Sequence, residues 1–313
     1  MPVEAETLAP VIAPPVEAPD SAPGIGARLA FLLKVSRPGF WLVTAWFYLL
    51  PLGQQPVFSS WRFWLGLLYF SFPFSFLLYA WNDLADKGTD RFNPRKGNFL
   101  YGARGSDRQL SGLPLAIAVV QTPFVLLFTV LEGPRVLIWF AALLLANALY
   151  NAPRFGFRTV PVLDMLNQVG YLLVFPLCIW LNGVPALPWA TYLFSALFAI
   201  HSHLFGQIMD LEPDRRSGRR TTATVIGILP AKALLVVLLL GEAALFAGPL
   251  RATVVAGLFV VAALWFTLDA AVLWKDRLYT TAQTHLFGLA FNLAALASMP
   301  GIWLSGIFVR HIP

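Results

Sequence analysis

The stretch FWLGLLYFSFPFSFLLYAWNDLADKGTD, residues 63–90, decides the fold class of this chain. Its first part, residues 63–82, carries no charged side chain. A helix needs about 20 apolar residues to cross a bilayer. Similar uncharged runs occupy residues 39–60, 109–131 and 165–209. Because every span must satisfy its own backbone hydrogen bonds, these runs predict an all-α, polytopic membrane protein.

The composition excludes other classes of protein. Hydrophobic residues make up 58% of the 313 positions and charged residues 12%, whereas soluble domains carry roughly 25% charged residues. The formal net charge of +6 does not indicate a nucleic-acid partner, because the basic residues lie in short loops between apolar runs. The single cysteine, Cys178, excludes a disulfide framework and a thiolate metal site.

About nine spans fit the apolar runs, and turn residues such as Gly248-Pro249 separate them. We expect spans at about 39–55, 61–82, 112–131, 135–151, 162–181, 188–210, 223–247, 252–274 and 284–308. Residues 1–23 are rich in Pro and Ala, lack Lys and Arg, and are expected to form a disordered tail. Residues 24–313 then form a single transmembrane domain.

The distribution of Lys and Arg predicts the orientation in the membrane. Segments on the side of the N-terminus hold 17 of these residues, and the opposite ends of the spans hold 4. Basic residues concentrate in cytoplasmic loops of membrane proteins. The N-terminus and the loops at 83–111, 152–161 and 211–222 are therefore expected on the cytoplasmic side, with the C-terminus outside.

Two acid-rich motifs lie at the cytoplasmic ends of the second and sixth spans. In a helix, Asp83, Asp86 and Asp90 share one face, because they stand at positions i, i+3 and i+7. Asp210 and Asp214 repeat the i, i+4 spacing in the second motif. A solvated acidic helix end accounts for one such cluster, but two carboxylate clusters at membrane depth on one side indicate a functional site.

Magnesium suits such a pair of motifs. Carboxylate oxygens favour Mg²⁺, which binds one or two carboxylates together with a substrate phosphate, and both motifs lack the His and Cys ligands of zinc. Basic residues follow each cluster and would neutralise phosphate oxygens. A basic cytoplasmic loop explains the same residues without a phosphate, so the acids carry more of the argument.

The chain resembles the UbiA superfamily of intramembrane prenyltransferases over residues 28–308. The residues that carry the resemblance are Asn82, Asp83, Asp86 and Asp90 with the run from Arg91 to Lys96, then Asp210, Asp214 and Arg215 with Gly218 and Thr221 to Thr224, and between them Tyr150, Asn151, Pro153 and Arg154. The resemblance implies a ring of about nine helices around a central chamber. It also implies a reaction in which an isoprenoid diphosphate loses diphosphate and an acceptor captures the allylic carbocation.

Residue roles follow from the resemblance by position. The expected ligands of Mg²⁺ are Asn82, Asp83, Asp86, Asp90, Asp210 and Asp214. The expected diphosphate-binding residues are Asn82, Arg91, Arg95, Lys96, Arg158 and Arg215, and the expected catalytic residues are Asp86, Asp210, Asp214, Tyr150 and Asp164. Tyr150, Asn151 and Asp164 would line the pocket near the reacting carbon. His203, seven residues before Asp210, faces the chamber or packs as a core histidine.

The diphosphate motifs do not report the acceptor. Runs such as Tyr101-Gly102-Ala103 and His203-Leu204-Phe205-Gly206 resemble the carotenoid branch, of the lycopene elongase type, with a five-carbon diphosphate as donor. A quinone precursor or another aromatic acceptor is the first alternative, and a (bacterio)chlorophyll precursor is another. An ion-coupled transporter is the alternative of another class, although transporters usually place such carboxylates near the midplane. The expected partners are thus a prenyl diphosphate, a lipophilic acceptor and the bilayer.

Overall fold

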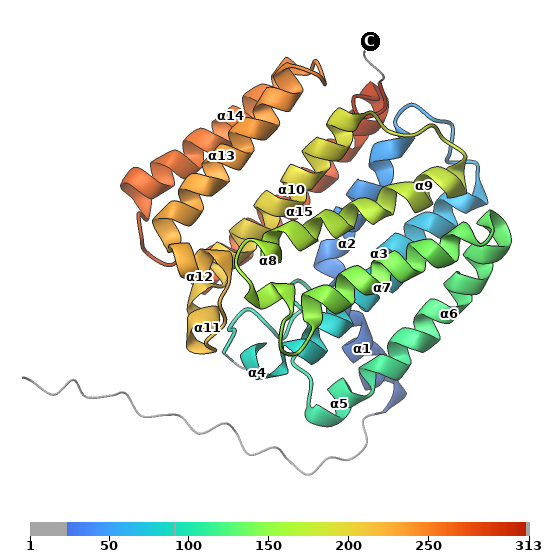
Figure 1. Cartoon of the computed structure of the whole chain (residues 1–313), viewed down its shortest axis with the longest axis horizontal. Helices are drawn as coiled ribbons and strands as arrows, with labels where there is room; N and C mark the ends of the chain where they lie inside the picture. Colours follow the sequence, from blue (N-terminus) through green and yellow to red (C-terminus); the bar gives the residue numbers. More distant parts are fainter. Residues whose placement is uncertain (1–23, 91, 311–313) are drawn as a thin grey trace, which may run out of the picture.

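The fold is helical throughout the part of the chain that the computed structural model describes, residues 24–90 and 92–310 (Figure 1). The tail expected at residues 1–23 lies outside these residues. The helices of the N-terminal half are α1 (Ile25–Val35), α2 (Pro38–Leu49), η1 (Leu50–Leu52), α3 (Trp61–Ala85), α4 (Lys87–Asp90), α5 (Asp107–Ser111), α6 (Leu113–Glu132) and α7 (Arg135–Asn151). Those that follow are η2 (Phe157–Thr159), α8 (Leu163–Leu166), η3 (Asn167–Leu173), α9 (Val174–Asn182), α10 (Trp189–Met209), α11 (Leu211–Arg216), α12 (Thr222–Ile226), α13 (Ile228–Ala247), α14 (Thr253–Leu268), η4 (Asp269–Leu273) and α15 (Thr281–Ser305).

Six helices are long and apolar enough to cross a membrane. They are Trp61–Ala85, Asp107–Glu132, Leu163–Asn182, Ile228–Ala247, Thr253–Leu273 and Thr281–Ser305. Pro38–Leu52 and Arg135–Asn151 are shorter apolar helices, and α10 has 21 residues. Each of the nine expected ranges therefore contains helix, which confirms the all-α membrane class, while the count of nine spans stays a prediction.

The seventh expected span is wrong at its start. The helical run expected from residue 223 ends at Ile226, and α13 begins at Ile228. Gly227 separates the two helices with a φ of 87°, a left-handed conformation that glycine adopts without steric cost. The short helix α12 packs against both α13 and α10, and its Ala223 amide donates to the Gln207 side chain near the end of α10.

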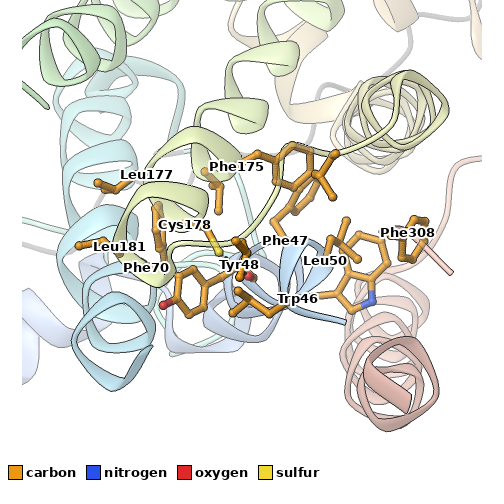
Figure 2. Packing of buried hydrophobic residues seen from close by; sticks show 14 of the residues in the cluster. Trp46, Phe47, Tyr48, Leu50, Phe70, Phe175, Leu177, Cys178, Leu181 and Phe308 are labelled. Atoms are coloured by element: carbon orange, nitrogen blue, oxygen red, sulfur yellow. Dashed lines mark hydrogen bonds between the residues drawn. The ribbon is translucent and has the colours of Figure 1, made fainter. Parts of the chain in front are cut away.

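The largest core cluster is rich in aromatic side chains and joins α2, α3 and α9 to the segment after α15 (Figure 2). Tyr48 is fully buried there, and its hydroxyl donates to the carbonyl of Phe63 at 3.0 Å. A Cβ at Gly66 would lie 2.3 Å from that hydroxyl oxygen. Glycine is therefore required at this position for α2 and α3 to approach each other.

Charged side chains inside the helical body are paired between neighbouring helices. Lys232 on α13 lies 3.0 Å from Asp269, and both side chains are almost fully buried. Glu242, also on α13, lies 2.6 Å from Nδ1 of His201 on α10. Because an unpaired charge in an apolar interior is very costly, these pairs fix α13 against its two neighbours.

Candidate functional site

A cavity of about 1280 Å³ runs through the helical body. Its lining comes from α2, α3, α7, η3, α10, α13, α14 and α15. One end of the cavity is polar, because α3 and α10 end there and the short helices α4 and α11 follow them (Figure 1). The rest of the wall is mostly aromatic and aliphatic. The helices thus surround a central chamber, as the resemblance implies.

The two acid motifs have the same local backbone. Asp86 ends α3 with φ −96° and ψ 7°, and Asp210 ends α10 with φ −97° and ψ 7°. The amides of Asp90 and Asp214 then donate to the carbonyls of Asp86 and Asp210, at 2.8 and 2.9 Å. The first motif is therefore not one continuous helix face as expected, because the helix breaks at Asp86. The break keeps Asp86 and Asp90 on the cavity and separates them from Asp83.

Arginines link the two motifs crosswise. Arg95, which follows the first motif, forms an ion pair with Asp210 of the second. Arg219, which follows the second motif, forms an ion pair with Asp86 of the first and lies 3.5 Å from Asp214. Arg158 forms an ion pair with Asp86 as well. The two motifs, far apart in the sequence, therefore form one electrostatic unit. We call its members on the cavity the polar tier: Asn82, Asp86, Asp90, Asn93, Arg95, Lys96, Arg158, Asp210, Asp214 and Arg219.

The polar tier contains most of the expected site residues. Those that line the cavity are Asn82, Asp86, Asp90, Arg95, Lys96, Tyr150, Arg158, Asp210 and Asp214. Arg219 and Asn93 also line it; from the sequence, Arg219 is expected only as one of the basic residues after the second cluster, and Asn93 only as part of the run from Arg91 to Lys96. Arg219 stands five residues after Asp214, as Arg95 stands five residues after Asp90, and this repeated spacing is a signal that identifies it.

Asp83 lies behind the cavity wall. Its side chain is almost fully buried and is absent from the cavity lining. Lys96 and Arg37 hold its Oδ1 at 2.6 and 2.8 Å, and Lys96 also lies 2.9 Å from Asp90. The geometry therefore makes Asp83 the anchor of two basic side chains and does not place it where a ligand in the cavity would lie.

Three further expected residues lie away from the cavity or beyond the described chain. Asp164 is fully buried and accepts hydrogen bonds from Gln207 at 2.8 Å and from the backbone amide and hydroxyl of Thr222, both at 2.6 Å. It thereby ties α8 to α10 and α12. Arg215 is exposed and does not line the cavity. Arg91 lies outside the residues that the structure describes.

Burial perturbs the ionisation of the polar tier. Burial and the neighbouring Asp210 carboxylate raise the pKa of Asp214 to about 8. Burial also raises the pKa of Asp90, although the Lys96 ammonium opposes the shift. Burial lowers the pKa of Arg219 to about 10, which leaves it charged at neutral pH. A cation bound among these carboxylates would relieve their mutual repulsion.

The donor set fits magnesium. Within residues 24–90 and 92–310, no three His, Cys, Asp or Glu side chains are close enough to hold a metal alone. Asp86 with Asp90, and Asp210 with Asp214, instead form two carboxylate pairs on one cavity. Mg²⁺ usually takes only one or two carboxylates and completes its shell with water and substrate phosphate. These residues therefore suit a metal that arrives with a diphosphate.

Comparison with known proteins identifies the family. No protein-family model matches the chain. The chain is 30% identical over 255 residues to a lycopene elongase/hydratase of Corynebacterium glutamicum, covering 79% of this chain and 86% of the relative. It is 30% identical over 279 residues to a lycopene elongase/hydratase of Halobacterium salinarum, covering 85% and 97%.

A solved structure has the same fold. A UbiA homologue from Archaeoglobus fulgidus, bound to GPP and Mg²⁺, matches with a TM-score of 0.65 and 18% identity, over 87% of this chain and 99% of the homologue. A second structure of such a homologue, bound to DMAPP and Mg²⁺, matches with a TM-score of 0.64. The chain therefore belongs to the lycopene elongase/hydratase family, and it has the fold of the UbiA homologue.

Proposed function

We propose that this enzyme transfers a prenyl group from a five-carbon allylic diphosphate to a carotenoid in the membrane, with Mg²⁺ as cofactor. The observation that carries the proposal is the division of one cavity into an end rich in acidic and basic side chains and a long, mostly apolar remainder, whose charged side chains are Arg251 and Arg310. The charged end suits a metal–diphosphate. The apolar remainder suits a prenyl chain and a hydrocarbon acceptor.

The polar tier would hold the leaving group. Asn82, Asp86, Asp90, Asp210 and Asp214 would share the metal, because they supply oxygen ligands from two sides of the same space. Arg95, Lys96, Arg158 and Arg219 would then bind phosphate oxygens, since charge-assisted hydrogen bonds from Arg to phosphate are strong. When bound, Mg²⁺ neutralises the negative charge that develops on the departing diphosphate.

The apolar part of the cavity would protect a carbocation from water. Phe47, Phe74, Tyr171 and Phe198 are on its wall, and aromatic faces stabilise a nearby cation. Tyr79 and Tyr171 bring their hydroxyl oxygens within 3.5 Å of each other on the same wall, so their polar atoms face each other. A wall of this kind would limit hydrolysis of the allylic cation before the acceptor captures it.

A carotenoid acceptor is supported by size, access and relatives. The cavity of about 1280 Å³ exceeds the range of roughly 300–1,000 Å³ that small-molecule pockets occupy. Leu258 and Trp265 on α14 line the cavity and keep 64% and 45% of their area accessible. We propose α14 as the side at which a hydrocarbon would enter from the lipid. The relatives in two organisms are lycopene elongase/hydratases.

The experiment uses the purified chain in nanodiscs with dimethylallyl diphosphate, lycopene and Mg²⁺. We expect diphosphate release together with pigment that gains one isoprene unit. Asp86→Asn and Asp210→Asn should abolish both signals. Asp107→Asn is the matched control, because this carboxylate begins the short helix α5, is absent from the cavity lining and has 82% of its side chain exposed.

Two results would contradict the proposal. Diphosphate release that requires a phenolic or quinone-precursor acceptor, with lycopene unchanged, would assign an aromatic substrate to the same site. Prenyl transfer at the wild-type rate in Asp86→Asn and Asp210→Asn would show that the polar tier takes no part in the reaction. We also infer that the polar tier lies on the cytoplasmic side, because Lys and Arg concentrate at that end.

A further inference from the structure

His203 and Tyr150 form a polar pair on the cavity wall, between the polar tier and the aromatic part. His203 belongs to α10 and Tyr150 to the last turn of α7, and both line the cavity. Nε2 of His203 lies 3.4 Å from the Tyr150 hydroxyl oxygen, and the two rings are steeply inclined at 76°. Within the described chain, Nδ1 of His203 makes no hydrogen bond.

The position of His203 follows from helix geometry. It stands seven residues before Asp210, so the two side chains leave α10 within about 20° of each other. The same spacing puts His203 roughly 10 Å further along the helix, away from the polar tier. A diphosphate held at Asp210 through Mg²⁺ would place its prenyl carbons about as deep in the cavity as His203.

His201 provides the contrast on the same helix. It stands nine residues before Asp210, half a turn out of phase, and so leaves α10 on the opposite side. Its Nδ1 lies 2.6 Å from Glu242 on α13. His201 also lines the cavity, but its Nδ1 is engaged by Glu242 in the α10–α13 contact. His203 instead shares the face of Asp210 and makes no hydrogen bond at Nδ1 within the described chain.

We infer that His203 is the base that ends the reaction, and this inference rests on the proposed function. The donor C–O bond breaks and its electron pair leaves with the diphosphate. The π electrons of the acceptor double bond form the new C–C bond, which leaves a tertiary carbocation on the acceptor. A proton on the neighbouring carbon then passes to Nδ1 of His203, and its C–H electron pair becomes the new double bond.

Hydration of the same carbocation needs the same base. A water oxygen forms the C–O bond with a lone pair, and the oxonium gives its proton to Nδ1. In this tautomer the Nε2–H donates to the Tyr150 oxygen, so Tyr150 positions the ring and stabilises the imidazolium. The imidazolium returns its proton to water when the products leave. One residue thus serves both activities in the name of the relatives, elongase and hydratase.

Other groups on this part of the wall are poor bases. Asn147, Asn167 and Gln168 are neutral amides, and the phenols of Tyr79 and Tyr171 keep their protons at neutral pH. The carboxylates of the polar tier form ion pairs with arginines.

The test compares His203→Ala and His203→Gln with the wild-type chain in nanodiscs. His285→Gln is the matched control, since this histidine is outside the cavity lining at the start of α15. Elongated and hydrated pigments are measured by mass spectrometry. Affinity for dimethylallyl thiolodiphosphate with Mg²⁺, an analogue that ionises slowly, reports whether the variants fold and bind donor. Imidazole is then added to the His203→Ala variant.

Loss of a general base costs about 100-fold or more in rate. We expect both His203 variants to lose at least that much product at unchanged analogue affinity. Imidazole should restore part of the activity in His203→Ala only, because glutamine leaves no space for it. Wild-type rate and products in His203→Gln would overturn the inference and assign the proton to the departing diphosphate.

Further outcomes are also decisive. Lost activity with intact analogue binding and no rescue by imidazole would overturn the inference, because His203 would then only pack. Lost analogue binding in both variants would overturn it too, by making His203 part of the donor site. A wild-type chain that releases no diphosphate from any prenyl donor would refute the proposed function instead, and the inference would fall with it.

Discussion

The variant Asp83→Asn tests whether Asp83 binds the metal or instead holds Arg37 and Lys96 in place. The Asp83 carboxylate lies between Arg37 and Lys96, and the three side chains are 3%, 14% and 5% exposed. Removing one partner of a buried ion pair costs about 3–5 kcal/mol, because the remaining charge is uncompensated. Asp90, 2.9 Å from Lys96, offsets part of this loss. We therefore expect the melting temperature to fall by roughly 10 °C.

The assay uses the one cysteine of the chain. Cys178 is fully buried, so a thiol-reactive fluorogenic dye reports its exposure on unfolding. Melting curves are recorded at one scan rate with and without Mg²⁺ and dimethylallyl thiolodiphosphate. A ligand at 100 times its Kd stabilises by about 2.7 kcal/mol, which is roughly 5–10 °C here. Asp83→Asn should keep this ligand shift from its lower baseline, whereas Asp86→Asn should lose it.

The opposite pattern would refute this reasoning. If Asp83→Asn melts with the wild type but shows no ligand shift, Asp83 binds the metal–diphosphate and the ion pairs with Arg37 and Lys96 contribute little. If both Asp83→Asn and Asp86→Asn keep the full ligand shift, neither carboxylate belongs to the donor site.

Four shorter predictions follow from the same structure. EDTA should stop diphosphate release and Mg²⁺ should restore it; activity that persists in EDTA argues against a metal. Arg158→Met should raise the KM for the donor about 10- to 100-fold, since a hydrogen bond to a charged group contributes about 1.5–3 kcal/mol, and an unchanged KM would remove Arg158 from the donor site. Glu242→Leu should lower the melting temperature unless His201→Phe accompanies it, because two apolar residues often replace a buried pair without loss. A membrane-impermeant thiol reagent should label Ser59→Cys and Ser111→Cys from opposite sides of the bilayer, and labelling from one side would refute the predicted topology.

Run length and spacing predict the helices well, but they do not predict which acidic side chains point into the cavity. Uncharged runs locate the apolar helices because span length is a physical requirement of the bilayer. Asp83 and Asp86 differ by three positions and read as equivalent in the sequence. The break at Asp86 separates them, since the backbone at that residue has left the helical conformation. Asp164 likewise reads as a pocket residue, but its partners Gln207 and Thr222 come from segments distant in the sequence.

The crossed ion pairs explain why the site should bind a metal–diphosphate and not a bare diphosphate. Arg95 neutralises Asp210 and Arg219 neutralises Asp86, so each motif depends on the other for charge balance. A complex of Mg²⁺ and diphosphate offers positive charge to both carboxylates and negative charge to both arginines. Every buried charge then exchanges one partner for another, and none is left uncompensated. A diphosphate alone would take Arg95, Arg219 and also Arg158, the second partner of Asp86, and would leave Asp86 and Asp210 without a cation beside a polyanion. We therefore expect the analogue to bind only when Mg²⁺ is present, even though Arg95 and Arg219 lie in the same site.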